Sequence, residues 1–165
     1  MARLAGGIAL IIGIISAIGV VFIIVMFVLF ATPLKELGQR FGMLNDICVA
    51  FQYLLTVPIA LVLYRSLVLY NPVLIRIATI VGTVGMLAVF ALQLALIFGV
   101  LTFQQQVGWV TLVMFLGVGS WLVMTGLVAR STGRLPNSMR MSLLAVPYVG
   151  YPAWAFWLGL HLLAW

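Results

Sequence analysis

Long apolar stretches alternate with short polar ones along this chain, and the pattern predicts helices that cross a lipid bilayer. A bilayer-spanning helix needs about 20 mostly apolar residues, and five stretches reach that length. We expect spans at about 4–31, 44–69, 73–101, 108–129 and 141–165, with an outer loop at 32–43. The predicted fold class is all-α: a polytopic transmembrane helix bundle forming a single domain over residues 1–165.

The composition supports lipid as the solvent of this chain. It has 165 residues, of which 66% are hydrophobic and 6% charged, whereas a soluble domain carries about 25% charged residues. The first apolar stretch exceeds the roughly 7–15 residues of a signal-peptide core, so we interpret it as an uncleaved first helix. We expect an integral protein of a bacterial inner membrane.

The cations predict the orientation of the bundle. One side collects six arginines: Arg3, Arg65, Arg76, Arg130, Arg134 and Arg140. The other side has Lys35 and Arg40, offset by Glu36 and Asp46. Cations accumulate on the cytoplasmic side of membrane proteins, so the N-terminus is predicted inside the cell and the C-terminus outside. Because the cations stand singly at helix ends, we expect them to contact anionic lipid and not nucleic acid.

Small residues recur at helical spacing and predict close helix packing. The first stretch carries Gly6, Ala9, Gly13, Ser16 and Ala17 on one face. The third carries Ala78, Gly82, Gly85, Ala88, Ala95 and Gly99. Such faces let helix backbones approach each other in lipid. They exceed what five helices need among themselves, which favours an accessory or scaffolding subunit that associates with other membrane subunits or with itself.

The stretch at 32–43 holds most of the charge outside the arginine-rich loops. It is compatible with a short interfacial helix or with a solvated linker. In a helix, Glu36 and Arg40 would form an i,i+4 pair of opposite sign. Asn45 or Asp46 would then cap the second span.

Polar side chains at matching depths predict either a pocket or interhelical hydrogen bonds. The set comprises Asn45, Gln52, Thr56, Gln93 and Ser120, with Asp46 at its mouth. Gln52 and Gln93 both lie on the order of 11 Å from the same surface, so their amides can meet if the second and third helices are neighbours. A pocket open to the outside would suit a carrier or sensor of a small apolar molecule.

A histidine near the end of the chain suggests a second kind of site. His161 stands at helical spacing from Trp154 and Trp157. The arrangement resembles single-span antenna polypeptides, in which a neutral imidazole ligates the metal of a chlorophyll-type ring; a haem would suit it equally. The alternative interpretation is an aromatic belt at the bilayer surface.

Catalysis and metal binding by protein groups alone have little support in the sequence. The chain has one cysteine, Cys48, which excludes an internal disulfide, and one histidine and two acids. Asp46 has no second acid or histidine near it in sequence, so it is a poor candidate for a general base. We therefore expect a protein that is not an enzyme and holds no protein-only metal site.

Two short motifs carry a family resemblance. They are Leu63-Tyr64-Arg65 at the end of the second span and Thr132-Gly133-Arg134-Leu135-Pro136 before the last. The chain resembles small bacterial multi-span membrane proteins of unknown function, a resemblance that implies no activity and no functional residue.

Overall fold

A computed structural model describes residues 2–132 of the chain, and within them the protein is all-α. The elements are α1 (Ala2–Phe30), α2 (Lys35–Leu67), α3 (Pro72–Ile97), α4 (Phe103–Val113), the π-helical segment η1 (Met114–Gly119) and α5 (Ser120–Thr132). The last three follow one another without a break and form one long rod, Phe103–Thr132.

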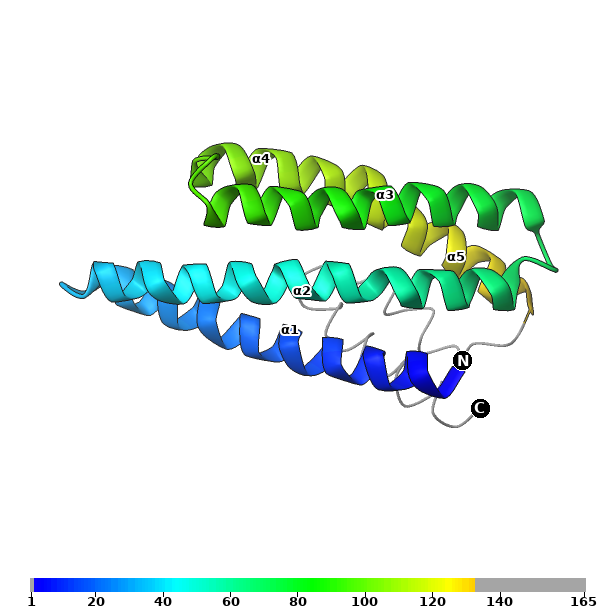
Figure 1. Ribbon diagram of the computed structural model, residues 1–165, viewed down its shortest axis with the longest axis horizontal. Coiled ribbons are helices and arrows are strands. Elements are labelled where there is room, and N and C mark those ends of the chain that lie inside the picture. Colours follow the sequence, from blue (N-terminus) through cyan, green and yellow to red (C-terminus); the bar gives the residue numbers. More distant parts are fainter. Residues whose placement is uncertain (1, 133–165) are drawn as a thin grey trace.

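The helices form two antiparallel hairpins that lie against each other (Figure 1). The first hairpin is α1–α2, and the second pairs α3 with the α4–η1–α5 rod. The two are joined through α2, which packs along α3. Figure 1 also shows that the α1–α2 turn and the α3–α4 turn lie at the same end of the bundle, and that the α1–α2 turn projects further.

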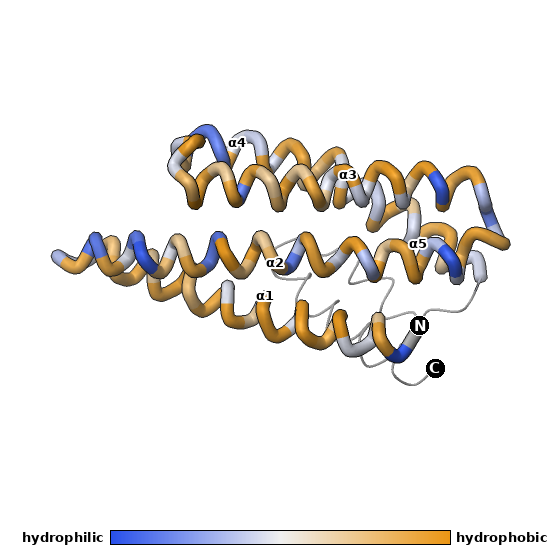
Figure 2. The backbone as a smooth tube through the Cα atoms, viewed as in Figure 1, coloured by the Kyte–Doolittle hydropathy of each residue, from blue (hydrophilic) through white to orange (hydrophobic). Residues whose placement is uncertain are grey.

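Four helices in this part of the chain are long and apolar enough to cross a membrane, as in an integral membrane protein. Figure 2 shows hydrophobic positions along most of each helix, with hydrophilic positions near helix ends and along the first part of α2. The predicted span at 141–165 and the C-terminus lie outside the described residues, so the count of five spans stays a prediction.

The predicted outer loop is wrong from Lys35 onward, because α2 begins at that residue and not at about residue 44. The connection from α1 is a turn of a few residues around Pro33. No proline interrupts the chain between Lys35 and Asp46, and both glycines in that stretch pack against α1. The helix has 33 residues, about 50 Å, which exceeds the ~30 Å hydrocarbon core of a bilayer. Its charged first turns can therefore stay helical and lie outside the hydrocarbon.

The turn between α3 and α4 lies earlier in the chain than predicted, because α3 ends at Ile97 and not at about residue 101, and α4 begins at Phe103 and not at about residue 108. Gly99 has φ +70°, a left-handed backbone conformation that glycine adopts without strain and that commonly ends helices. Gly99 therefore ends α3 and does not extend its small-residue face. Before α3, the Asn71 side chain accepts a hydrogen bond from the Leu74 backbone N–H at 3.1 Å and caps the helix.

The small-residue face of α1 is mostly confirmed. Gly6, Ala9, Gly13 and Ser16 are buried, whereas Ala17 is exposed. The core continues through the centre of the other helices with Thr56, Ile59, Ile75, Met86 and Trp121, all fully or nearly fully buried.

Candidate functional site

The α1–α2 hairpin is held tightly near its turn by two glycines of α2. A Cβ at Gly38 would lie 2.7 Å from Phe30 Cδ1, and one at Gly42 would lie 2.9 Å from Met26 Sδ. One turn further along the bundle, a Cβ at Gly19 would lie 3.2 Å from Asn45 Oδ1. The spacing of Gly38 and Gly42 is the small-xxx-small pattern that lets helices approach closely in lipid. Residues 38–45 of α2 are therefore positioned by contact with α1.

A groove opens beside this contact, where the longer first hairpin rises past the turn of the second. Its volume is about 630 Å³, within the size range of small-molecule sites. Throughout, "the groove" means the cavity lined by Ile23, Met26, Phe27, Phe30, Gln39, Gly42, Met43, Asn45, Asp46, Leu96, Ile97 and Phe103. The described part of the chain thus contributes four elements to it: α1, α2, the end of α3 and the start of α4.

The groove lining is apolar on α1, α3 and α4, and its polar side chains all come from α2. Side chains of α1, α3 and α4 supply hydrocarbon, sulfur and aromatic surface, while α2 supplies Gln39, Asn45 and Asp46. Asn45 and Asp46 are half-buried and Gln39 is exposed. Among the described residues that line the groove, Asp46 is the one ionisable side chain. The site can therefore hold an apolar body and direct a polar group toward one carboxylate and two amides.

The structure brings only part of the predicted polar set to this groove. Asn45 and Asp46 line it, whereas Gln52, Thr56, Gln93 and Ser120 do not. Gln52 and Thr56 are buried in α2. The Thr56 hydroxyl donates to the backbone carbonyl of Gln52 at 2.7 Å. Ser120 is half-buried at the first position of α5.

The amide of Gln93 is engaged by a residue that sequence reasoning missed. Gln106 Nε2 donates to Gln93 Oε1 at 3.0 Å, and both side chains are buried. Gln106 belongs to α4, because that helix starts at Phe103 after a capping box in which Thr102 Oγ1 accepts from the Gln105 N–H. Thr102 and Gln105 have the spacing of that motif, so the sequence contained the signal. Gln93 thus serves as a hydrogen-bonding contact between α3 and α4.

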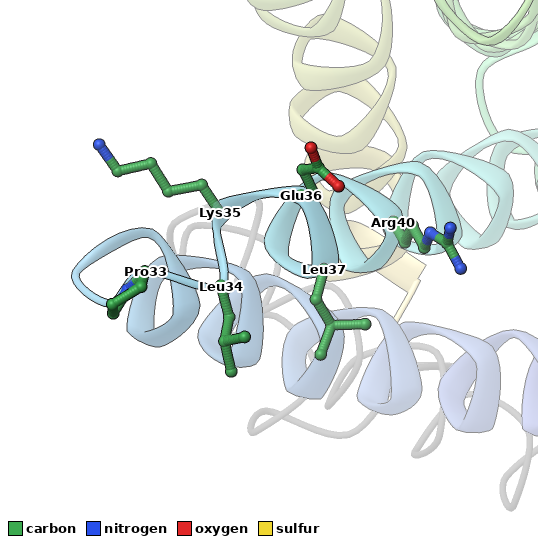
Figure 3. A pocket seen from close by; sticks show the side chains of 6 residues that line it. All are labelled: Pro33, Leu34, Lys35, Glu36, Leu37 and Arg40. Carbon is green, nitrogen blue, oxygen red and sulfur yellow. The ribbon is translucent and has the colours of Figure 1, made fainter.

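The predicted cap of the second span at Asn45 or Asp46 is wrong. Asp46 does not cap a helix: it lies well inside α2, whose N-cap is Leu34 without a side-chain hydrogen bond. Glu36 and Arg40 line a second, smaller hollow of about 520 Å³ at the α1–α2 turn, together with residues 33–35 and Leu37. Figure 3 shows their charged groups directed away from each other, while Leu34 and Leu37 point to the opposite side of the helix. The charged groups and the two leucines therefore lie on different sides of the first part of α2, one of the helices that are long and apolar enough to cross a membrane.

Glycines also bring α3 against the rod formed by α4, η1 and α5. A Cβ at Gly85 would lie 2.8 Å from Gly117 Cα, and one at Gly82 would lie 2.8 Å from Trp121 Cδ1. Gly117 belongs to η1, and π-helical turns of this kind alter which side chains face a neighbouring helix. These contacts are made inside the chain, as are those of Gly19, Gly38 and Gly42.

The remaining candidate residues cannot be placed. His161, Trp157 and Trp154 lie outside the described residues, so the haem or chlorophyll-type site stays a prediction. Within residues 2–132, no group of three or more His, Cys, Asp or Glu side chains is arranged to hold a metal ion. Comparison with family models, with curated proteins and with solved structures found no match to this chain.

Proposed function

We propose that this chain is an integral membrane protein, without catalysis of its own, that binds a small amphiphilic molecule in the groove and acts as its carrier or sensor. The single observation that carries the proposal is the groove itself, whose lining is apolar except for Gln39, Asn45 and Asp46 on one side. Binding sites for small molecules have this composition: a mostly hydrophobic wall with a few convergent polar groups that fix orientation.

The position of the groove favours a ligand that enters from the membrane surface. Asp46 follows Lys35, the first residue of α2, by eleven positions in the sequence, which is about 16 Å along the helix. If α2 is centred in the bilayer, about 10 Å of it projects from each side of the hydrocarbon core. The polar side of the groove then lies near the boundary between headgroups and hydrocarbon, and positive-inside orientation directs it out of the cell.

The groove also offers a way for a ligand to change the protein. Its walls come from both hairpins, since Phe27 and Met43 belong to the first and Leu96 and Phe103 to the second. A molecule held between them contacts both, so its binding free energy depends on the spacing of the hairpins at this end. A sensor requires such a differential interaction with two arrangements of the protein.

The accessory or scaffolding role has less support from the helix contacts. It was predicted from small-residue faces in excess of internal needs, but Gly38, Gly42, Gly82, Gly85 and Gly117 all make close contacts within the chain. The apolar outer surface of the helices can be covered by lipid as well as by a partner subunit. The carrier or sensor role is therefore the better supported of the two.

The test is photolabelling in lipid nanodiscs with a diazirine-bearing long-chain alcohol as the probe. Met43 lines the groove with half of its surface exposed, and Leu44 is the neighbouring exposed residue that does not line it. Met43→Trp should fill the groove without disturbing the α1–α2 contact and should abolish labelling of Phe27, Leu96 and Phe103. Leu44→Trp is the matched control and should leave that labelling intact. If the probe does not label Phe27, Leu96 or Phe103 in the unmodified protein, the proposal is contradicted. It is also contradicted if Met43→Trp and Leu44→Trp are labelled equally at these residues.

A further inference from the structure

We propose that the groove selects amphiphiles whose head carries an amine, with Asp46 as the group that recognises it. This inference rests on the proposed binding function and adds the chemical class of the ligand. It follows from the charges of the lining, from the depth of Asp46 and from the geometry of the neighbouring cations.

The lining offers an amine one carboxylate, that of Asp46, as its partner. An ammonium group has three N–H donors and no acceptor, and the polar residues of the groove are Asp46, whose carboxylate accepts a side-chain hydrogen bond from Asn45, and Gln39. Hydrogen bonds to an ionised group are roughly twice as strong as those between neutral groups. An alcohol of the same length would fill the apolar part equally but would form only one donated hydrogen bond.

The cations of α2 are not placed to pair with the carboxylate of Asp46. Lys35 and Arg40 line the hollow at the α1–α2 turn and do not line the groove. By helical geometry, Arg40 is about 120° around α2 and about 9 Å along its axis from Asp46, and Lys35 is about 16 Å away along the axis. A carboxylate near hydrocarbon is costly without a cation or several donors, so a bound ammonium group stabilises the site.

The same lining disfavours a phospholipid as the occupant. A phosphate is recognised by Arg or Lys side chains or by helix N-terminal amides, and no Arg or Lys is among the described residues of the groove. A phospholipid head would bring its phosphate close to Asp46 without a compensating cation. The favoured ligand is therefore an amine with an apolar tail and no phosphate.

The experiment compares two photoreactive probes that share one tail and differ in the head, an amine and an alcohol, in phosphatidylcholine nanodiscs. In the unmodified protein, the amine should label the groove residues on the order of tenfold more strongly than the alcohol. Asp46→Asn should abolish this preference while leaving labelling by the alcohol unchanged. Glu36→Gln, which removes the other acid of α2 from outside the groove, is the matched control and should keep the preference.

Each remaining outcome is decisive. Equal labelling by both probes in the unmodified protein overturns the amine inference and leaves the proposed function standing. A preference that survives Asp46→Asn overturns the role of Asp46. Suppression of amine labelling by phosphatidylethanolamine in the nanodisc identifies a phospholipid as the occupant and overturns the exclusion of phosphate. Absence of groove labelling by either probe contradicts the proposed function itself.

Discussion

The side chain of Gln106 in α4 donates a hydrogen bond of 3.0 Å to the side chain of Gln93 in α3, and both amides are buried. The two residues are 13 positions apart in sequence and meet across the α3–α4 turn. In lipid, such a bond between helices is worth about 0.6 kcal/mol on average. Its larger effect is to fix the register of α3 against α4, beside the groove wall formed by Leu96 and Phe103.

This bond predicts a non-additive pair of substitutions. Gln106→Leu should lower the free energy of unfolding by about 1–2 kcal/mol, because the buried Gln93 amide loses its partner. Gln93→Leu together with Gln106→Leu should recover most of that loss, since no buried amide is then unpaired. The measurement is reversible unfolding by SDS in mixed micelles, with the exposed Gln104→Leu as a control. Additive losses in the double variant contradict the pairing.

The contact between Gly85 and Gly117 predicts a position that does not accept a side chain. Gly85→Leu should lower the free energy of unfolding by about 2 kcal/mol, because the new side chain must separate α3 from η1. Gly108 is the matched control, since a Cβ there has nothing within 4 Å. Gly108→Leu should be neutral in the same unfolding measurement. Equal effects of the two variants would show that the α3–η1 contact is absent.

The continuity of α2 predicts how the charged stretch responds to proline. Gln39→Pro should destabilise the protein by about 3 kcal/mol, because position 39 is inside the helix. Lys35→Pro should be tolerated, because Lys35 is the first helical residue and proline suits that position. Thermal unfolding in detergent, followed by circular dichroism, distinguishes the two. If 33–43 were a loop, both variants would unfold at the temperature of the unmodified protein.

The capping box at Thr102 predicts a local effect at the start of α4. Thr102→Ala removes the acceptor of the Gln105 N–H and should cost about 1 kcal/mol. Amide hydrogen exchange should accelerate in the first turn of α4 and stay unchanged in α2. Thr111→Ala, at an exposed position inside α4, is the control and should leave the exchange pattern unaltered. Unchanged exchange at Gln105 in Thr102→Ala would contradict the cap.

The sequence was sufficient for the helical class and for most of the small-residue face of α1, because both follow from spacing along a single helix. The sequence pattern does not predict a helix boundary correctly where charged residues lie inside the end of a helix. The charged residues from Lys35 to Arg40 are compatible in sequence with a loop or a separate helix, whereas in the structure they belong to α2. The fourth helix begins earlier than the apolar pattern predicts, because Thr102 and Gln105 form a capping box ahead of its apolar residues.

The part of the candidate site that matches the predicted pocket comes from a single helix, α2. Asn45 and Asp46 were expected at an open pocket, and they do line the groove. The apolar wall was not foreseen, because Phe27, Leu96 and Phe103 come together only when one hairpin rises past the turn of the other. The partner of Gln93 was missed for the same reason, since the choice between Gln52 and Gln106 depends on helix positions that periodicity does not determine.

The central claim is that the α1–α2 and α3–α4 turns lie on the same side of the membrane, where the groove opens between them. Cys48→Ala removes the one native cysteine, so single cysteines can be introduced at Thr32, Tyr70 and Thr102, one in each turn. Labelling of intact cells with a membrane-impermeant maleimide should modify positions 32 and 102 from outside and position 70 only after permeabilisation. Modification of positions 32 and 102 from opposite sides would contradict the arrangement of the hairpins and, with it, the groove.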